Sequence, residues 1–154
     1  MTKEEKAKVF FKEGYNCAQA VFLAFADDLK IDKNTVIKLT SSFGGGMGRL
    51  REVCGAVSGM FMVVGMFKGY TDPKNNNAKI EHYKMIQELA KRFKEINNSI
   101  ICRELLGLSV KSESPTPQLR TDEYYKKRPC VKFVGDAARI LEEMIRQEET
   151  KGSK

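Results

Sequence analysis

The sequence has a single histidine and no closely spaced cysteines, and these two shortages restrict the chemistry that it can support. Because His82 is the only histidine in 154 residues, a Ser-His-Asp or Cys-His catalytic arrangement depends wholly on where that side chain lies. We expect His82 at the boundary between the polar and apolar sides of a helix, and not at a site. None of the four cysteines belongs to a Cys-x-x-Cys pair, which argues against a zinc ribbon, a thioredoxin-like motif and a covalently attached c-type haem.

Long apolar runs are also missing. The longest, from Val53 to Phe67, covers about fifteen residues and is shorter than the roughly 20 that a membrane-spanning helix needs. The first residues lead into no secretory signal, so we expect a cytoplasmic protein whose thiols are kept reduced. In that compartment, cysteines serve as buried apolar residues, metal ligands or redox thiols more often than as structural disulfides.

The charge is basic but not concentrated. The net charge is +7, which favours anionic partners, yet no block of Lys and Arg with interleaved aromatic residues marks a nucleic-acid surface. We therefore interpret the excess charge as a solvated basic surface, and nucleic-acid binding is only the weaker alternative.

Helical periodicity and capping residues predict an all-α, single-domain protein over residues 1–154, because neither strand alternation nor a repeat of 20 to 50 residues is present. We expect a compact bundle of about six to seven helices around a central Gly-rich apolar helix. The predicted helices cover 2–12, 17–29, 32–42, 53–68, 75–97, 100–106 and a final helix from 129. Residues 108–128 are predicted to form a long loop, and 148–154 a frayed tail.

A glycine-rich run, Gly44 to Gly48, leads into the central helix at Cys54. Free N–H groups and the partial positive charge at a helix start favour a thiolate over a thiol. Gly55 and Gly59 leave room there for a second helix, a partner sulfur or an inorganic cluster. The run lacks both the Gly-x-Gly-x-x-Gly spacing and a Gly-Lys-Ser/Thr ending, so we expect no bound nucleotide.

All four cysteines share one predicted setting. Cys17, Cys54, Cys102 and Cys130 each lie within about one turn of a predicted helix start and on the apolar face of the helix. We therefore expect them to converge on one pocket at which several helices begin. The alternative is that they are buried apolar filler, since free cysteine is among the most buried residue types.

The motifs around these cysteines resemble a known family. The sequence Gly-Tyr-Asn-Cys-Ala-Gln-Ala-Val at 14–21 is followed by the glycine run, by Cys-Gly-Ala-Val-Ser-Gly at 54–59, and then by Cys102 and Cys130. From about residue 5 to 146 the chain resembles the redox-active proteins named for the pattern C-GCAxxG-C-C. The resemblance implies a small helical protein with a redox role for all four cysteines. The cysteine-rich part of split-Soret cytochromes is also similar and suggests an iron–sulfur cluster, but their haem-binding part is absent here.

Three functions compete. In the first, the cysteines carry out thiol/disulfide or electron-transfer chemistry; Cys54, whose flanks Arg49 and Arg51 are basic, attacks, and one of the other three cysteines resolves. In the second, four thiolates hold an iron–sulfur cluster, with zinc as a variant, and the positions of Gly55, Ala56 and Gly59 bind the cofactor. In the third, a non-catalytic helical module binds a partner. The redox partner (a protein or a small molecule), turnover of a substrate and homo-oligomer formation stay open.

Overall fold

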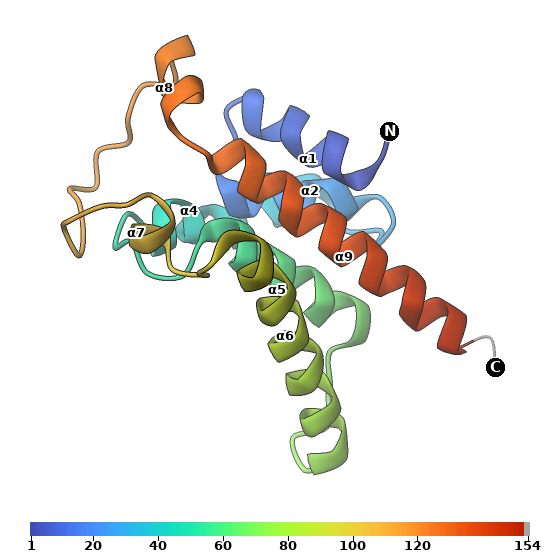
Figure 1. Cartoon of the computed structure of the whole chain (residues 1–154). Coiled ribbons are helices and arrows are strands. Elements are labelled where there is room, and N and C mark those ends of the chain that lie inside the picture. The colour runs from blue at the N-terminus through green and yellow to red at the C-terminus, as the bar shows by residue number, and fades with distance from the viewer. Residues whose placement is uncertain (153–154) are drawn as a thin grey trace.

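The computed structural model describes residues 1–152, and their regular structure is helical (Figure 1). The elements are α1 (Lys3–Lys12), α2 (Cys17–Ala26), α3 (Lys33–Thr40), the 3₁₀ turn η1 (Ser41–Phe43), α4 (Gly44–Met47), α5 (Gly55–Lys68), α6 (Asn76–Asn97), α7 (Cys102–Leu105), α8 (Asp122–Lys127) and α9 (Cys130–Gly152). Within this part of the chain no strand forms, and one isolated antiparallel bridge joins Val53 to Ile101. The predicted all-α, single-domain bundle is confirmed. None of the helices described is long and apolar enough to cross a membrane.

Polar caps fix where the helices begin. Asn16 closes a capping box at α2, in which its side chain accepts from the Gln19 backbone N–H at 2.9 Å and the Gln19 side chain accepts from the Asn16 N–H at 2.9 Å. Thr2 and Glu5 form the same arrangement at α1. Because the cap sets the first residue of the helix, Asn16 places Cys17 at the N-terminus of α2.

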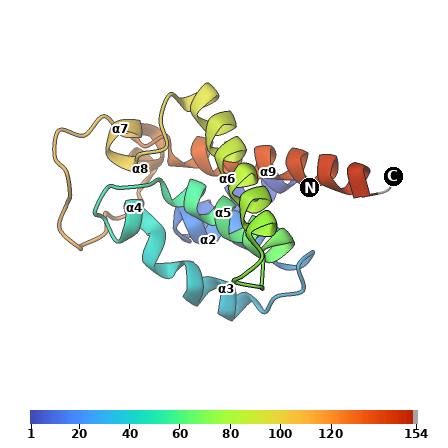
Figure 2. The ribbon, with the colours of Figure 1, turned by 90° about the horizontal axis from the view of Figure 1, so that it is seen from below.

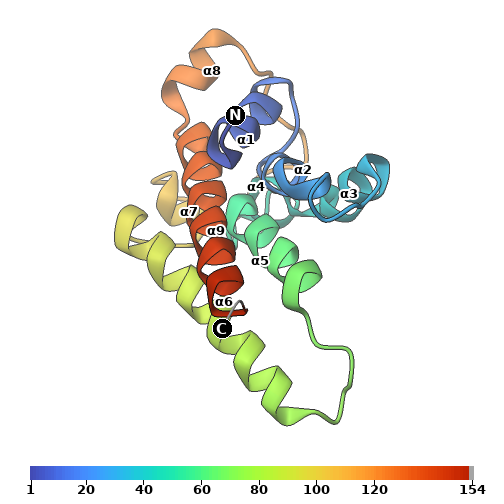
Figure 3. The ribbon, with the colours of Figure 1, turned by 90° about the vertical axis from the view of Figure 1, so that its right-hand side faces the viewer.

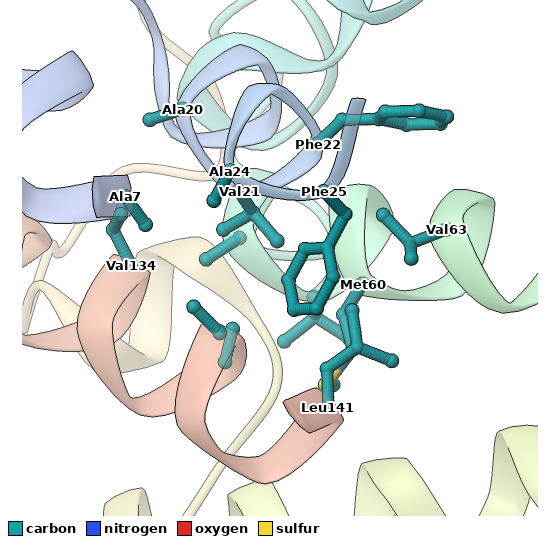
Figure 4. Close-up of a cluster of buried hydrophobic side chains, with 14 of the residues drawn as sticks. Ala7, Ala20, Val21, Phe22, Ala24, Phe25, Met60, Val63, Val134 and Leu141 are labelled. Carbon is teal, nitrogen blue, oxygen red and sulfur yellow. The ribbon is translucent and has the colours of Figure 1, made fainter. Parts of the chain in front are cut away.

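The core lies between α1, α2, α5 and α9. Figure 4 shows Val21 and Phe25 of α2 facing Met60 of α5 and Leu141 of α9. Small residues on α2 and α5 let these two helices approach closely, and α5 also contacts α6 and α9. The Gly-rich helix α5 is therefore central, as its apolar composition predicts.

One end of the bundle gathers the elements that carry the site. In Figures 1 and 2, α4 and α7 lie at the end where α5 and α9 begin, and the connection from α7 to α8 loops out from it. Figure 3 shows the other end, where α6 leads back along the molecule beside α9. The starts of several helices thus share one region, while their remaining turns build the core.

Two predicted boundaries differ from the structure. The expected loop at 108–128 contains α8, because Thr121 accepts from the Tyr124 N–H at 3.2 Å and acidic residues in the first turn and basic residues in the last suit the helix dipole. The expected tail at 148–154 is helical as far as Gly152, where ion pairs such as Lys151–Glu148 support the last turns. Residues 153 and 154 lie outside the described part.

Candidate thiol site

The four cysteines line one cavity of about 380 Å³. Cys17, Cys102 and Cys130 are the first residues of α2, α7 and α9, and Cys54 is the N-cap of α5. Cys54, Cys102 and Cys130 are buried, Cys17 is half-buried, and all four are free thiols. The structure therefore brings together four thiols that are far apart in the sequence, each at the start of a helix.

A short backbone contact places Cys54 beside Cys102. The Cys54 N–H donates to the Ile100 carbonyl at 2.8 Å, and the Cys102 N–H donates to the Glu52 carbonyl at 2.5 Å, on either side of the bridge between Val53 and Ile101. A bridge of this length leaves no alternating pattern in the sequence, which is why the sequence alone does not reveal it.

The glycine run folds into the tight turn of α4, not into an open loop. Gly45 and Gly46 both have φ of +69°, in the left-handed region that favours glycine. A Cβ at Gly46 would lie 2.6 Å from the Cys102 Cβ and 2.9 Å from the Arg51 Cα. Glycine at this position is what allows the turn to pass directly over Cys102.

Of the three residues predicted to bind a cofactor, only Gly55 lines the cavity. A Cβ there would lie 2.7 Å from the Phe43 carbonyl oxygen and 3.1 Å from the Cys17 Cβ. Ala56 is fully buried in the core, and a Cβ at Gly59 would lie 2.8 Å from the Ala18 carbonyl oxygen. Beside Gly59 the space is therefore occupied by α2, and Ala56 and Gly59 serve helix packing.

Cys17 and Cys130 form a hydrogen-bonded pair of thiols. The Cys17 thiol donates to the Cys130 sulfur and lowers the pKa of Cys130 to about 7, against the effect of burial and with help from Arg128, Arg51 and Arg120. The same hydrogen bond, together with burial, holds the pKa of Cys17 well above its ordinary value. One sulfur of the pair is thus prepared to be a thiolate near neutral pH while the other keeps its proton.

The other two thiols are held in their neutral form. Burial raises the pKa of Cys54 to about 12, although the N–H groups of Ala56 and Val57 donate to its sulfur. Burial also raises the pKa of Cys102, and Arg51, whose Nη1 lies 3.5 Å from the Cys102 Sγ, only partly opposes this. Burial outweighs the favourable helix start at Cys54 and argues against the expectation that Cys54 is the attacking sulfur.

Four arginines line the cavity, and no Asp or Glu does so in the described chain. Arg49 and Arg51 bind the same carboxylate, that of Glu113, at 3.1 and 2.9 Å. Instead of flanking an open loop, these two arginines fasten the segment after α7 to the turn at α4.

The remaining two arginines lie near Cys130. The Arg120 Nη1 donates to the Phe11 carbonyl at 2.6 Å, and its guanidinium stacks 4.1 Å from the Phe11 ring centroid. The Arg128 Nη2 donates to the Gln118 Oε1 at 3.0 Å. Their signal in the sequence is weak, since only Arg128, two residues before Cys130, stands close to a cysteine.

His82 takes no part in the cavity. Its ring packs edge-on against Tyr70, with centroids 6.0 Å apart, and its Nδ1 is buried without a hydrogen-bond partner. Triad-type catalysis with this histidine is therefore not available at the thiols.

The thiols do not stand as a ready set of metal ligands. Among residues 1–152, no three His, Cys, Asp or Glu side chains are arranged closely enough to hold a metal ion. The donor set itself, four thiols, is one that zinc or an iron–sulfur cluster accepts, but the side chains as they stand do not surround a single zinc ion.

Comparisons with known proteins agree with this cysteine-centred site. A family model described as "Putative redox-active protein (C_GCAxxG_C_C)" matches residues 15–144, which is most of the chain and includes all four cysteines. No curated protein and no solved structure gives a significant match.

Proposed function

The chain belongs to the C_GCAxxG_C_C family of redox-active proteins, and from this premise we propose that it is a dithiol protein that reduces disulfides through Cys130 and Cys17. The observation that carries the proposal is that these two thiols, at the starts of α2 and α9, line one cavity together with Arg128 and Arg120, and that Cys17 and the arginines lower the pKa of Cys130. Nucleophile and resolving thiol then share one cavity.

The exchange proceeds in two displacements. The Cys130 thiolate attacks one sulfur of the substrate disulfide, that S–S bond breaks, and the first substrate thiolate leaves and takes up a proton. Cys17 then loses its proton and attacks the Cys130 sulfur of the mixed disulfide, which releases the second substrate thiolate. Cys17 and Cys130 end as a disulfide, having given two electrons to the substrate; one of the two protons that the substrate thiolates take up comes from Cys17 and the other from water. An external dithiol restores them.

Cys54 and Cys102 have no step in this exchange. Both are buried and carry raised pKa values, so at neutral pH they are poor nucleophiles. We infer that they form the floor of the cavity.

The test uses the reduced protein and bis-hydroxyethyl disulfide, a small neutral substrate. We expect release of two thiols per protein and a Cys17–Cys130 disulfide in the peptide map. Cys130→Ser abolishes the reaction, Cys17→Ser stops at a mixed disulfide on Cys130, and the matched Cys102→Ser variant retains the rate. Full activity of Cys130→Ser, or a disulfide between other cysteines, would overturn the proposal.

The second candidate is a four-cysteine iron–sulfur or zinc site, and the observation that favours it is the presence of all four thiols around one cavity. No step is assigned to such a centre, because no group of side chains in residues 1–152 is arranged to hold a single metal ion. Anaerobic purification followed by visible absorption and by iron and zinc analysis decides between the two. Near-stoichiometric metal that protects all four cysteines from alkylation contradicts the dithiol proposal.

A further inference from the structure

Two arginines beside Cys130, Arg120 and Arg128, have no carboxylate partner among the described residues. Arg120 and Arg128 are both half-buried and line the cavity, and the ion pairs found in residues 1–152 include neither of them. Their recorded polar contacts, to the Phe11 carbonyl and the Gln118 side chain, are uncharged. Stacking on the Phe11 and Tyr124 rings compensates part of the desolvation of Arg120, but neither guanidinium has a carboxylate counterion, so both can still bind an anion.

The sum of the charges around the cavity also leaves an excess of positive charge. Its four arginines carry four positive charges, and Glu113, bound to Arg49 and Arg51, cancels one of them. A Cys130 thiolate cancels one more. Two positive charges therefore remain next to the reactive sulfur, in a partly enclosed space where charge acts more strongly than in water.

We propose that the disulfide substrate is a small anionic molecule, with a carboxylate or a similar oxyanion that binds Arg120 and Arg128 while its sulfur meets Cys130. This inference rests on the proposed dithiol function and adds the substrate class to it. Arginine suits the role because its planar N–H fork matches two oxygens of one anionic group.

The shape of the cavity limits the size of the ligand. A volume of about 380 Å³ lies at the lower end of the range for small-molecule sites. Its walls combine the arginines with the apolar side chains of Leu105, Leu106 and Phe133, and with Pro117 of the segment that Glu113 fastens down. A short aliphatic disulfide with negatively charged ends matches both the arginines and the apolar side chains of these walls.

The experiment compares three disulfides of similar length and different charge: dithiodipropionate (anionic), bis-hydroxyethyl disulfide (neutral) and cystamine (cationic). Each kcat/KM is divided by the rate of the same disulfide with free mercaptoethanol, which removes intrinsic reactivity. We expect the anionic substrate to exceed the neutral one by at least about tenfold and the cationic one to be slowest, with the difference shrinking at high salt.

Variants of Arg128 and Arg120 test whether these two residues cause the preference for the anionic disulfide. Arg128→Gln and Arg120→Gln each reduce the ratio of anionic to neutral rates several-fold, whereas Arg128→Lys retains part of it. The ratio is the readout because a change in the pKa of Cys130 alters both rates together. Lys127→Gln is the matched control, since it removes the same charge from the last residue of α8, where Lys127 is exposed, paired with Glu123 and outside the cavity.

A binding measurement separates this inference from the proposed function. Suberate is the carbon counterpart of dithiodipropionate and has no sulfur to exchange, so its binding to the Cys130→Ser protein, followed by NMR shifts, does not depend on redox chemistry. We expect suberate to bind, octanediol not to bind, and Arg128→Gln to weaken suberate. Equal normalised rates for the three disulfides together with no suberate binding overturn the inference and leave the dithiol function standing. Suberate binding without reduction of any disulfide overturns the function alone.

Discussion

The pair Cys17 and Cys130 and the pair Cys54 and Cys102 share one cavity, and all four residues stand at helix starts, yet the two pairs differ in acidity. In the first pair one thiol donates a hydrogen bond to the other, and the pKa of Cys130 falls to about 7. In the second pair burial raises both pKa values, that of Cys54 to about 12. The position at the start of a helix is common to both pairs and so does not explain the difference.

The comparison shows which contribution decides the state of a buried thiol. A helix dipole contributes about 0.3–1 kcal/mol, which is less than one pKa unit, whereas full burial shifts a pKa by up to about 3–5 units. Only a direct hydrogen bond with nearby unneutralised charge offsets a shift of that size. Cys130 has both, through Cys17 and through Arg128 and Arg120, and Cys54 has only two backbone N–H groups.

The largest expected effect is the difference in reactivity between Cys130 and Cys54. At pH 7 the ratio of thiolate fractions favours Cys130 by more than 10⁴, and the greater nucleophilicity of a less acidic thiol reduces the advantage to roughly a few hundredfold. Iodoacetamide labelling followed by peptide mass spectrometry measures it. The Cys130 rate should rise through pH 6–8 with a midpoint near 7, while Cys54 stays unlabelled. Faster labelling of Cys54 at pH 7 contradicts the assignment.

The second prediction concerns Cys17, since removing its thiol should raise the pKa of Cys130. In Cys17→Ala, the Cys130 sulfur loses its donor, so the midpoint of its alkylation should rise from about 7 toward the value of about 8.5 typical of a free cysteine. Cys17→Ser keeps a hydroxyl donor and should give a smaller rise, and Cys102→Ala, which leaves the pair intact, should keep the midpoint near 7. An unchanged midpoint in Cys17→Ala would show that the arginines alone set it.

A smaller effect, on the stability of the fold, is expected when a methyl group is added at Gly55, which lies next to Cys54 and close to Cys17. Gly55→Ala places a methyl group 2.7 Å from the Phe43 carbonyl oxygen and 3.1 Å from the Cys17 Cβ, and overpacking of this kind costs about 1–3 kcal/mol. Gly65→Ala is the matched control on the same helix; nothing lies within 4 Å of its added methyl group, so it should stabilise by about 0.5–1 kcal/mol. Urea unfolding measures both. Equal stabilities would show that α2 and α5 can separate at no cost.

Much of the fold follows from local signals in the sequence. The capping box at Asn16 and Gln19 and the apolar composition of α5 locate two central helices, and these place Cys17 and Cys54 at helix starts. The helix α8 was missed because a six-residue helix after a proline-containing segment has little periodicity to detect.

The chemistry of the site was harder to predict because it depends on contacts between distant residues. Which thiol meets which is set by tertiary packing, and Cys17 and Cys130 are separated by most of the chain. Burial of Cys54 is likewise a tertiary property, and the basic flanks Arg49 and Arg51 turn toward Glu113 and Cys102 instead. Convergence at helix starts could be inferred from residue positions, but the order of pKa values could not.

The bridge between Val53 and Ile101 has a consequence for the length of the chain on either side of it. Paired backbones direct successive side chains to opposite faces, so a shift of one residue between 46 and 54 would turn the Cys54 sulfur away from the cavity. Residues 47–50 are therefore restricted in number, and two of them also in kind, because Gly48 has a φ of +63° and Arg49 binds Glu113. The segment between α7 and α8 is free of this restriction except where Arg49 and Arg51 hold Glu113 and Ser114 and where Arg120 binds the Phe11 carbonyl, and insertions belong between those points.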